Sequence, residues 1–178
     1  FDYPLPFVER GDEVGVMARA FDAARGSIKD QMREIGAMAS ARQKLESELS
    51  IARDIQQSML PAGRGFDTAH MHVEAHALLE PASEVGGDFY QFSELEPGVL
   101  WFAIGDVSDK GIPAALFMAR TLTVLEQQAR RHGSPDRILA AASVRLAENN
   151  ETCMFATVLC GRLEVASGRF ALASAGHD

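Results

Sequence analysis

The first sixty residues repeat apolar side chains at spacings of three and four. This spacing predicts a long amphipathic helix whose apolar stripe is typical of a coiled-coil seam. The stripe shifts phase between Met38 and Leu45, which locally alters the winding of a coiled coil. So long a helix needs a partner for its stripe, either a second copy in a parallel dimer or the following domain. The stripe contains Val14, Met17, Phe21, Ile28, Met32, Ile35, Met38, Leu45, Leu49, Ala52, Ile55 and Met59.

Beyond Pro61 the apolar positions alternate, which predicts β-strands. We expect strands over residues 71–77, 88–92 and 99–104. In the first of these strands, one face is apolar and contains Met71, Val73, Ala75 and Ala77. The third is apolar throughout, so we expect it to be buried on both faces of a sheet.

Two helices and a hairpin complete the predicted order of elements. One helix is expected from Ile112 to about His132, and a second begins at Ser134, with serine as N-cap and Pro135 at the first helical position. Strands over 154–165 and 169–174 are then joined by a hairpin turn at Ser167-Gly168. This order predicts an α+β fold: a long N-terminal helix followed by an antiparallel sheet with helices.

Composition excludes some classes of function. The net charge is −8 with a pI of about 5.1, and no basic run occurs, which argues against nucleic acid and anionic membrane surfaces as partners. No bilayer-spanning segment or signal peptide is visible. The chain starts at Phe1 rather than a methionine and stops after a strand-like run, so we expect a fragment, and a membrane anchor before Phe1 stays open. Cys153 and Cys160 are interpreted as reduced core thiols of one strand.

Two aspartates are the strongest candidates for chemistry. Asp88 follows Gly86-Gly87, and Asp106 follows Gly105 at the end of the apolar strand. A buried carboxylate costs several kcal/mol unless it is compensated, and a divalent cation such as Mg²⁺ or Mn²⁺ compensates it well. The main-chain carbonyl of Val107 could join the coordination. Alternatively, both aspartates are turn residues that cap neighbouring amides.

Other sites are weaker or excluded. His70, His72 and His76 would share one strand face with Glu74, which could hold zinc, although exposed polar alternation explains the pattern more simply. No GxGxxG or Walker loop is present, which excludes phosphate binding by a glycine-rich loop.

Five segments occur in an order that resembles a known family: residues 51–61 (IARDIQQSMLP), 85–90 (VGGDFY), 105–115 (GDVSDKGIPAA), 154–157 (MFAT) and 175–177 (AGH). They are similar to the motifs of SpoIIE- and RsbU-type phosphatases, the bacterial branch of the PPM (type 2C) serine/threonine phosphatases.

The resemblance implies a β-sandwich flanked by helices and two Mn²⁺ or Mg²⁺ ions. By this analogy Asp106 and Asp88 are the catalytic, metal-binding residues: Asp106 bridges both ions, while Asp88 and the Val107 carbonyl each bind one. The ions would activate a water that attacks phosphorus. The implied substrate is phosphoserine or phosphothreonine on a regulatory protein, typically an anti-sigma-factor antagonist. His177 is expected to form structural hydrogen bonds rather than to act as a general acid.

Two departures from the family pattern matter. Asp109 stands where the family usually has glycine, so its carboxylate either tunes metal affinity or, as we favour, faces solvent. The family's remaining metal-binding aspartates follow the AGH motif, so residues 61–178 would be the N-terminal part of the domain, with little or no activity alone. A catalytically incomplete, phosphatase-like dimeric signalling module is therefore the alternative.

The N-terminal segment resembles another module. Pro6 and residues 12–21 (DEVGVMARAF) are similar to the connector and second helix of a HAMP module. This implies the C-terminal part of a HAMP module over residues 1–27 and a helical linker over 28–60. The protein would be a homodimer through its N-terminal helix, cytoplasmic or the cytoplasmic portion of a membrane-anchored protein. The alternative is an amphipathic helix with an acidic first turn.

Overall fold

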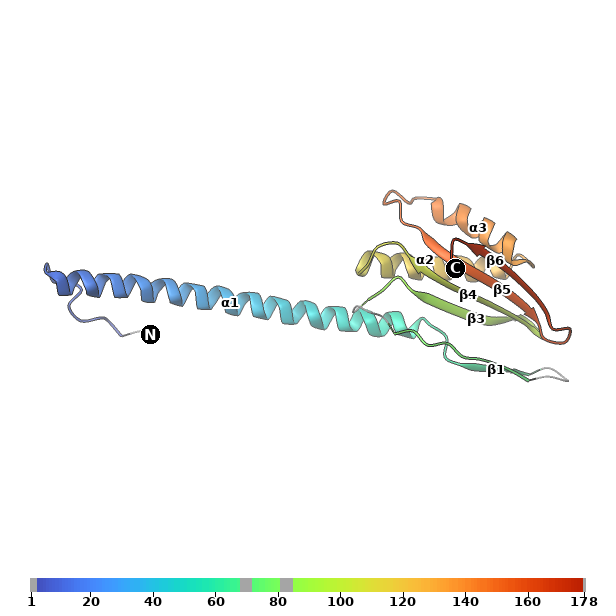
Figure 1. The fold of residues 1–178 in the computed structure, drawn as a ribbon, viewed down its shortest axis with the longest axis horizontal. Helices are drawn as coiled ribbons and strands as arrows, with labels where there is room; N and C mark the ends of the chain where they lie inside the picture. The colour runs from blue at the N-terminus through green and yellow to red at the C-terminus, as the bar shows by residue number, and fades with distance from the viewer. Residues whose placement is uncertain (1–2, 68–71, 81–84, 178) are drawn as a thin grey trace. The chain divides into compact units, whose positions relative to one another are not determined.

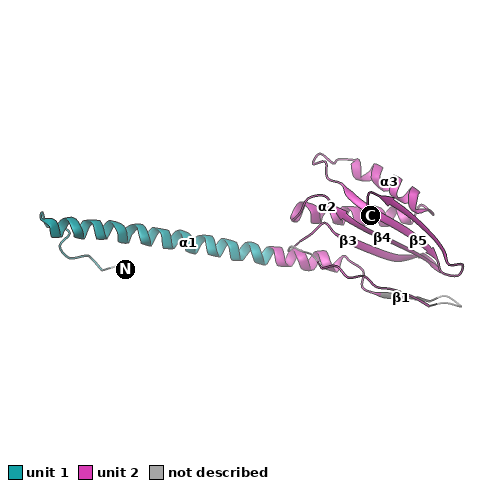
Figure 2. Ribbon diagram, viewed as in Figure 1, with its two compact units in different colours: residues 1–48 teal, residues 49–178 magenta. Residues whose placement is uncertain are grey.

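The structure, a computed structural model, describes residues 3–67, 72–80 and 85–177, so His70 and Met71 lie outside the described residues. The chain divides into two compact units, Phe1–Glu48 and Leu49–Asp178 (Figure 2). The division falls inside the first helix, whereas the sequence predicts domain boundaries after residues 27 and 60. The two units are described separately below.

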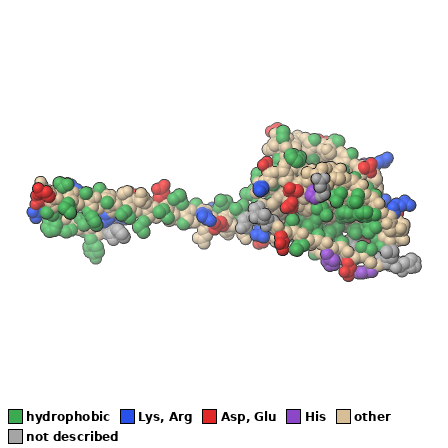
Figure 3. Space-filling view, in the orientation of Figure 1, with side chains coloured by type: hydrophobic (Ala, Val, Ile, Leu, Met, Phe, Trp, Pro, Cys, Tyr) green, Lys and Arg blue, Asp and Glu red, His purple; other side chains and the backbone are tan. Residues whose placement is uncertain are grey.

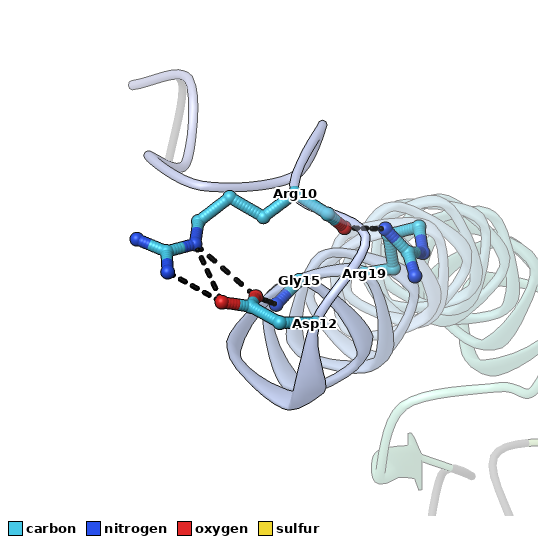
Figure 4. Close-up of polar contacts among 4 residues, drawn as sticks. All are labelled: Arg10, Asp12, Gly15 and Arg19. Carbon is cyan, nitrogen blue, oxygen red and sulfur yellow. Dashed lines mark hydrogen bonds and ion pairs between the residues drawn. The ribbon is translucent and has the colours of Figure 1, made fainter.

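In the first unit, the segment before helix α1 (Glu13–Ser58) is tied to the start of that helix. The Oδ1 atom of Asp12 accepts a hydrogen bond from the Gly15 amide at 3.2 Å, which is an N-cap contact, and Arg10 forms an ion pair with Asp12 (Figure 4). Arg19 donates hydrogen bonds to the carbonyls of Val8 and Arg10 at 2.8 and 2.9 Å. These contacts fix the direction in which the chain enters the helix.

Helix α1 confirms the predicted long N-terminal helix. It is continuous over 46 residues, and the phase shift between Met38 and Leu45 does not interrupt it. Its apolar stripe is exposed, with Met17 at 72% and Phe21 at 66% of their full accessible area. Among the described residues, no helix combines the length and the apolar character needed to cross a bilayer.

The second unit is built on an antiparallel sheet with strand order β3-β4-β5-β6 (Figure 1). The strands are β3 (Phe89–Glu96), β4 (Val99–Val107), β5 (Ala156–Glu164) and β6 (Arg169–Ala175). A separate hairpin pairs β1 (Arg64–Asp67) with β2 (His72–Ala75). The sequence interpretation missed β1, because its glycine-rich surroundings indicate a turn.

Helices α2 (Ile112–Ala129) and α3 (Pro135–Ala147) pack on one face of the sheet and form the main core. Trp101 and Ala103 of β4 are fully buried there, and Met118 and Leu125 of α2 cover them. Ser134 occupies the predicted N-cap position of α3 but makes no side-chain capping bond. Its side chain instead hydrogen-bonds to Asp136, and this bond is the main reason that the pKa of Asp136 is lowered.

The opposite face of the sheet is apolar and largely open (Figure 3). Val73 and Ala75 of β2 pack on Phe92 and Leu100, but Ile104 is 44% exposed. The expectation that residues 99–104 are buried on both faces is therefore wrong for the described residues. The predicted sandwich is not confirmed, because the described second layer consists of the β1–β2 hairpin.

The two cysteines differ in environment. Cys160 is fully buried in β5, where its Sγ accepts a hydrogen bond from the Trp101 indole at 3.1 Å. Cys153 is exposed in the turn before β5, with a φ of +53°. Its interpretation as a core thiol is wrong, because the strand begins only at Ala156.

Candidate functional site

The pairing of β3 with β4 brings the two candidate aspartates together. Phe89 pairs with Gly105 at the end of the antiparallel ladder, so Asp88 and Asp106 are opposed just beyond that pair. Both side chains are exposed. The sequence argument that Asp106 is buried in a fully covered strand is therefore wrong. The carboxylates are instead unfavourable neighbours because of their like charge.

The pKa of Asp88 reports this proximity. Partial burial raises the pKa above its ordinary value near 3.8, and the negative charge of Asp106 and a hydrogen bond between the two carboxyl groups raise it further. His177 acts in the opposite direction and lowers the same pKa. Two neighbouring carboxyl groups of like charge form a position where a cation is electrostatically favoured.

Gly87 permits the close approach of the loop to β4. Its carbonyl accepts a hydrogen bond from the Val107 amide at 3.3 Å. A Cβ atom at Gly87 would lie 2.6 Å from the Val107 carbonyl oxygen and 3.0 Å from Oδ1 of Asp106. A side chain at this position would therefore push Asp88 away from Asp106 and from the Val107 carbonyl.

Thr157 and His177 border the two aspartates from β5 and the chain after β6. Thr157 Oγ1 lies 3.0 Å from His177 Nδ1 and donates to the Asp106 carbonyl at 3.4 Å. Ser174 Oγ accepts the His177 amide at 3.2 Å and donates to its carbonyl at 2.8 Å. These bonds agree with the predicted structural hydrogen-bonding role of His177. The MFAT and AGH segments thus meet at the site, which sequence spacing alone could not show.

The loop after Val107 is anchored to the chain before β5. The Ser108 amide donates to the Phe155 carbonyl at 2.8 Å, and the Phe155 amide donates to Ser108 Oγ at 3.1 Å. Asp109 follows with a φ of +70°, in the left-handed region. Glycine reaches this region without strain, and aspartate is among the side chains that tolerate it best. The backbone at this position is therefore compatible with aspartate as well as with glycine.

The donor set suits a hard cation in type but is partial. Two carboxylates and a main-chain carbonyl are oxygen ligands of the kind that Mg²⁺ and Mn²⁺ prefer. Within residues 3–67, 72–80 and 85–177, however, no group of three or more histidine, cysteine, aspartate or glutamate side chains could hold a metal. His72, Glu74 and His76 therefore do not form the zinc site considered from the sequence, and their imidazole Nε2 atoms lie 3.2 and 3.5 Å from the Glu74 carboxylate.

The chain is similar in sequence to a family of sporulation proteins and to two bacterial proteins. The family model for stage II sporulation protein E (SpoIIE) matches residues 96–178. Phosphoserine phosphatase RsbU of Bacillus subtilis is 29% identical over 136 residues, which are 76% of this chain and 39% of RsbU. Protein IcfG of Synechocystis is 28% identical over 95% of this chain and 30% of that protein. The chain thus spans well under half the length of these relatives.

A solved structure extends the similarity to the fold. The SiaA-PP2C domain of Pseudomonas aeruginosa superposes with a TM-score of 0.62 and 20% identity, covering 78% of this chain and 56% of that domain. At this identity the match shows a shared fold. Together with the family model and the two relatives, it makes the C-terminal part of the chain similar to SpoIIE- and PP2C-type phosphatase domains.

Proposed function

We propose that the chain carries part of a metal-dependent protein serine/threonine phosphatase, with Asp88 and Asp106 as its metal-binding, catalytic carboxylates. The observation that carries the proposal is the juxtaposition of these carboxyl groups at the end of the β3–β4 ladder. A phosphatase that holds Mn²⁺ or Mg²⁺ would use this negative charge. The similarity to RsbU supports the choice of reaction.

Each residue of the site has a proposed task. Asp88, Asp106 and the Val107 carbonyl would hold two Mn²⁺ or Mg²⁺ ions together with ligands outside the described set. When bound, the ions would supply an activated water and neutralise charge on the phosphoryl group. Gly87 lets the two carboxylates approach each other. Thr157 lies within hydrogen-bond distance of His177, and the imidazole lowers the pKa of Asp88, which favours its charged form.

The proposed substrate is a phosphoserine or phosphothreonine of a regulatory protein, such as an anti-sigma-factor antagonist. An exposed site at the end of a sheet suits a protein substrate, because a phosphorylated side chain can reach it without a deep cleft. The similarity to a phosphoserine phosphatase supports this class of substrate.

The N-terminal unit is proposed to be the input side, with the end of a HAMP module over residues 1–27 and a linker over 28–60. The capped helix start at Asp12 and the arginine contacts to the preceding segment support a defined connector. The exposed apolar stripe of α1 supports a homodimer through this helix. The proposed location is the cytoplasm, or the cytoplasmic side of a membrane-anchored protein. Sedimentation velocity tests the dimer, and a monomer throughout the micromolar range would contradict it.

The reaction is tested with the full-length gene product, Mn²⁺ and a phosphoserine protein. We expect phosphate release that Asp106→Asn reduces at least a thousandfold, because the charge that holds the metal is lost. Asp136→Asn, a matched change in an exposed aspartate at the start of α3, is the control and should leave the rate unchanged.

The alternative is a phosphatase-like dimeric module that binds a partner without hydrolysis. It is favoured by the partial metal site among the described residues. The absence of phosphate release with Mn²⁺ or Mg²⁺ in the wild-type protein, together with a stable complex with the phosphoprotein, would establish this alternative.

A further inference from the structure

Gln56 is a buried polar residue near the end of α1, within the second unit. Its exposed fraction is 8%, whereas the adjacent Ile55 is 59% exposed and Gln57 is also exposed. Burying an amide is unfavourable unless its donor and acceptor are both used. The partners of Gln56 therefore indicate why the position is polar.

Both ends of the Gln56 amide bind the main chain of one residue. Nε2 donates to the Gly86 carbonyl at 2.6 Å, and Oε1 accepts the Gly86 amide at 3.2 Å. Nε2 also lies 3.3 Å from the Met118 sulfur of α2. A two-point contact of this kind fixes the position and the rotation of the Gly86 backbone, because each bond constrains a different peptide group.

Gly86 stands two residues before Asp88, and the intervening Gly87 is fixed from the other side. The Gly87 carbonyl accepts a hydrogen bond from the Val107 amide, and a Cβ atom at Gly87 would lie only 3.0 Å from Oδ1 of Asp106. The loop that carries Asp88 is thus held by α1 at one residue and by β4 at the next.

We infer that Gln56 is a positioning residue whose amide sets the place of Asp88 relative to Asp106 and so connects the end of α1 to the metal site. The inference rests on the proposed function for the identity of the ligand, and on the contacts of Gly86 and Gly87 for the connection. A displacement of the last turns of α1 would carry the Gly86 backbone with it and separate the two carboxylates.

A role in packing alone would have a different signature. If Gln56 only docked α1 on α2, its loss would lower the stability of the protein without changing the carboxylate pair in the folded state. A positioning role changes the loop and the metal affinity while the protein stays folded. The two roles are therefore separated by measurements on the folded protein.

The test uses Gln56→Met in the full-length gene product, because methionine keeps the length of the side chain and removes both hydrogen bonds. Gln57→Met, on the exposed side of the same turn, is the matched control. Amide hydrogen exchange is followed at Gly86 and Val107, and Mn²⁺ affinity is measured by electron paramagnetic resonance of the free ion. For Gln56→Met we expect about tenfold faster exchange at these amides and about tenfold weaker Mn²⁺ binding, as expected from the loss of one to two buried hydrogen bonds. The control should match the wild type.

If the amides of Gly86 and Val107 exchange in folded Gln56→Met at the same rates as in the wild type, the inference is overturned. Faster exchange with unchanged Mn²⁺ affinity overturns the connection to the metal site. If the wild-type protein binds no Mn²⁺, the proposed function fails, and the exchange rates still decide whether Gln56 positions the loop. If Gln56→Met does not fold, Gln56→Glu, which retains the acceptor for the Gly86 amide, is judged by the same measurements.

Discussion

Asp88 lies across from Asp106 just beyond the last pair of the β3–β4 ladder. In the absence of a cation, this arrangement stores repulsion between like charges. Partial burial and the charge of Asp106 both favour the protonated form of Asp88. The pair therefore makes the stability of the chain dependent on pH.

The sign of this dependence follows from the direction of the pKa shift. Since folding raises the pKa of Asp88 above its ordinary value near 3.8, Asp88 contributes stability below that value and loses the contribution as the pH rises through its raised pKa. Without divalent cations at pH 7, Asp88→Asn should therefore raise the Tm by about 2 °C, and the gain should vanish near pH 3. Thermal melts followed by circular dichroism from pH 3 to pH 7 in a chelator measure it.

Asp136→Asn provides a control of opposite sign. A hydrogen bond from Ser134 is the main cause of the lowered pKa of Asp136, so the charged form stabilises the fold above the ordinary pKa. Its replacement should lower the Tm at pH 7 and have no effect at the acid end. A lowered Tm for Asp88→Asn at pH 7 would contradict the repulsion between Asp88 and Asp106.

The cysteines should differ in reactivity. Burial raises the pKa of Cys160 to about 11, although the Trp101 hydrogen bond opposes the shift. Only about one thiol in a thousand would be ionised at pH 8, and the thiolate is the reactive species. Iodoacetamide should therefore modify the exposed Cys153 in the native chain and both cysteines in urea, as measured by mass spectrometry of the intact protein. Rapid native modification of Cys160 would show that this part of the core opens readily.

Gly161 should be intolerant of a side chain. It faces the ring of Phe102, which stacks on Phe170 with ring centroids 5.8 Å apart, and a Cβ atom would overlap that ring. Gly161→Ala should therefore lower the free energy of unfolding by about 1–3 kcal/mol, as overpacking does. Urea denaturation measures the loss.

Gly133→Ala is the matched control for Gly161→Ala. A Cβ atom at Gly133 would meet nothing within 4 Å, so the free energy of unfolding should change by less than about 0.5 kcal/mol. Equal effects of the two substitutions would mean that Phe102 moves aside at little cost.

Local pattern predicted much of the second unit. The alternation of Val73 and Ala75 with polar neighbours correctly assigned the half-buried face of β2, and Pro135 marked the start of α3. Such elements are predictable because the spacing of apolar positions records which face is buried. The turn at Gly168 between β5 and β6 is predictable for a different reason. Its φ of +66° favours glycine, and glycine between two strand-like runs indicates a hairpin turn.

Features that depend on tertiary contacts were not predictable. The exposure of Ile104 depends on how much of the second face is covered, which the apolar pattern of β4 does not state. The bonds between Gln56 and Gly86 join residues thirty positions apart, and the sequence contains no local signal for them. The meeting of Asp88 and Asp106 follows from strand register, whereas the family resemblance had suggested it only by analogy.

The left-handed backbone at Asp109 has a consequence for recognising phosphatase-like proteins by sequence motifs. A search profile that demands glycine at this loop position penalises a chain whose aspartate adopts the same torsion angle. Scoring the position by the φ it must reach, with aspartate and asparagine admitted beside glycine, would retain distant phosphatase-like sequences that a literal motif discards.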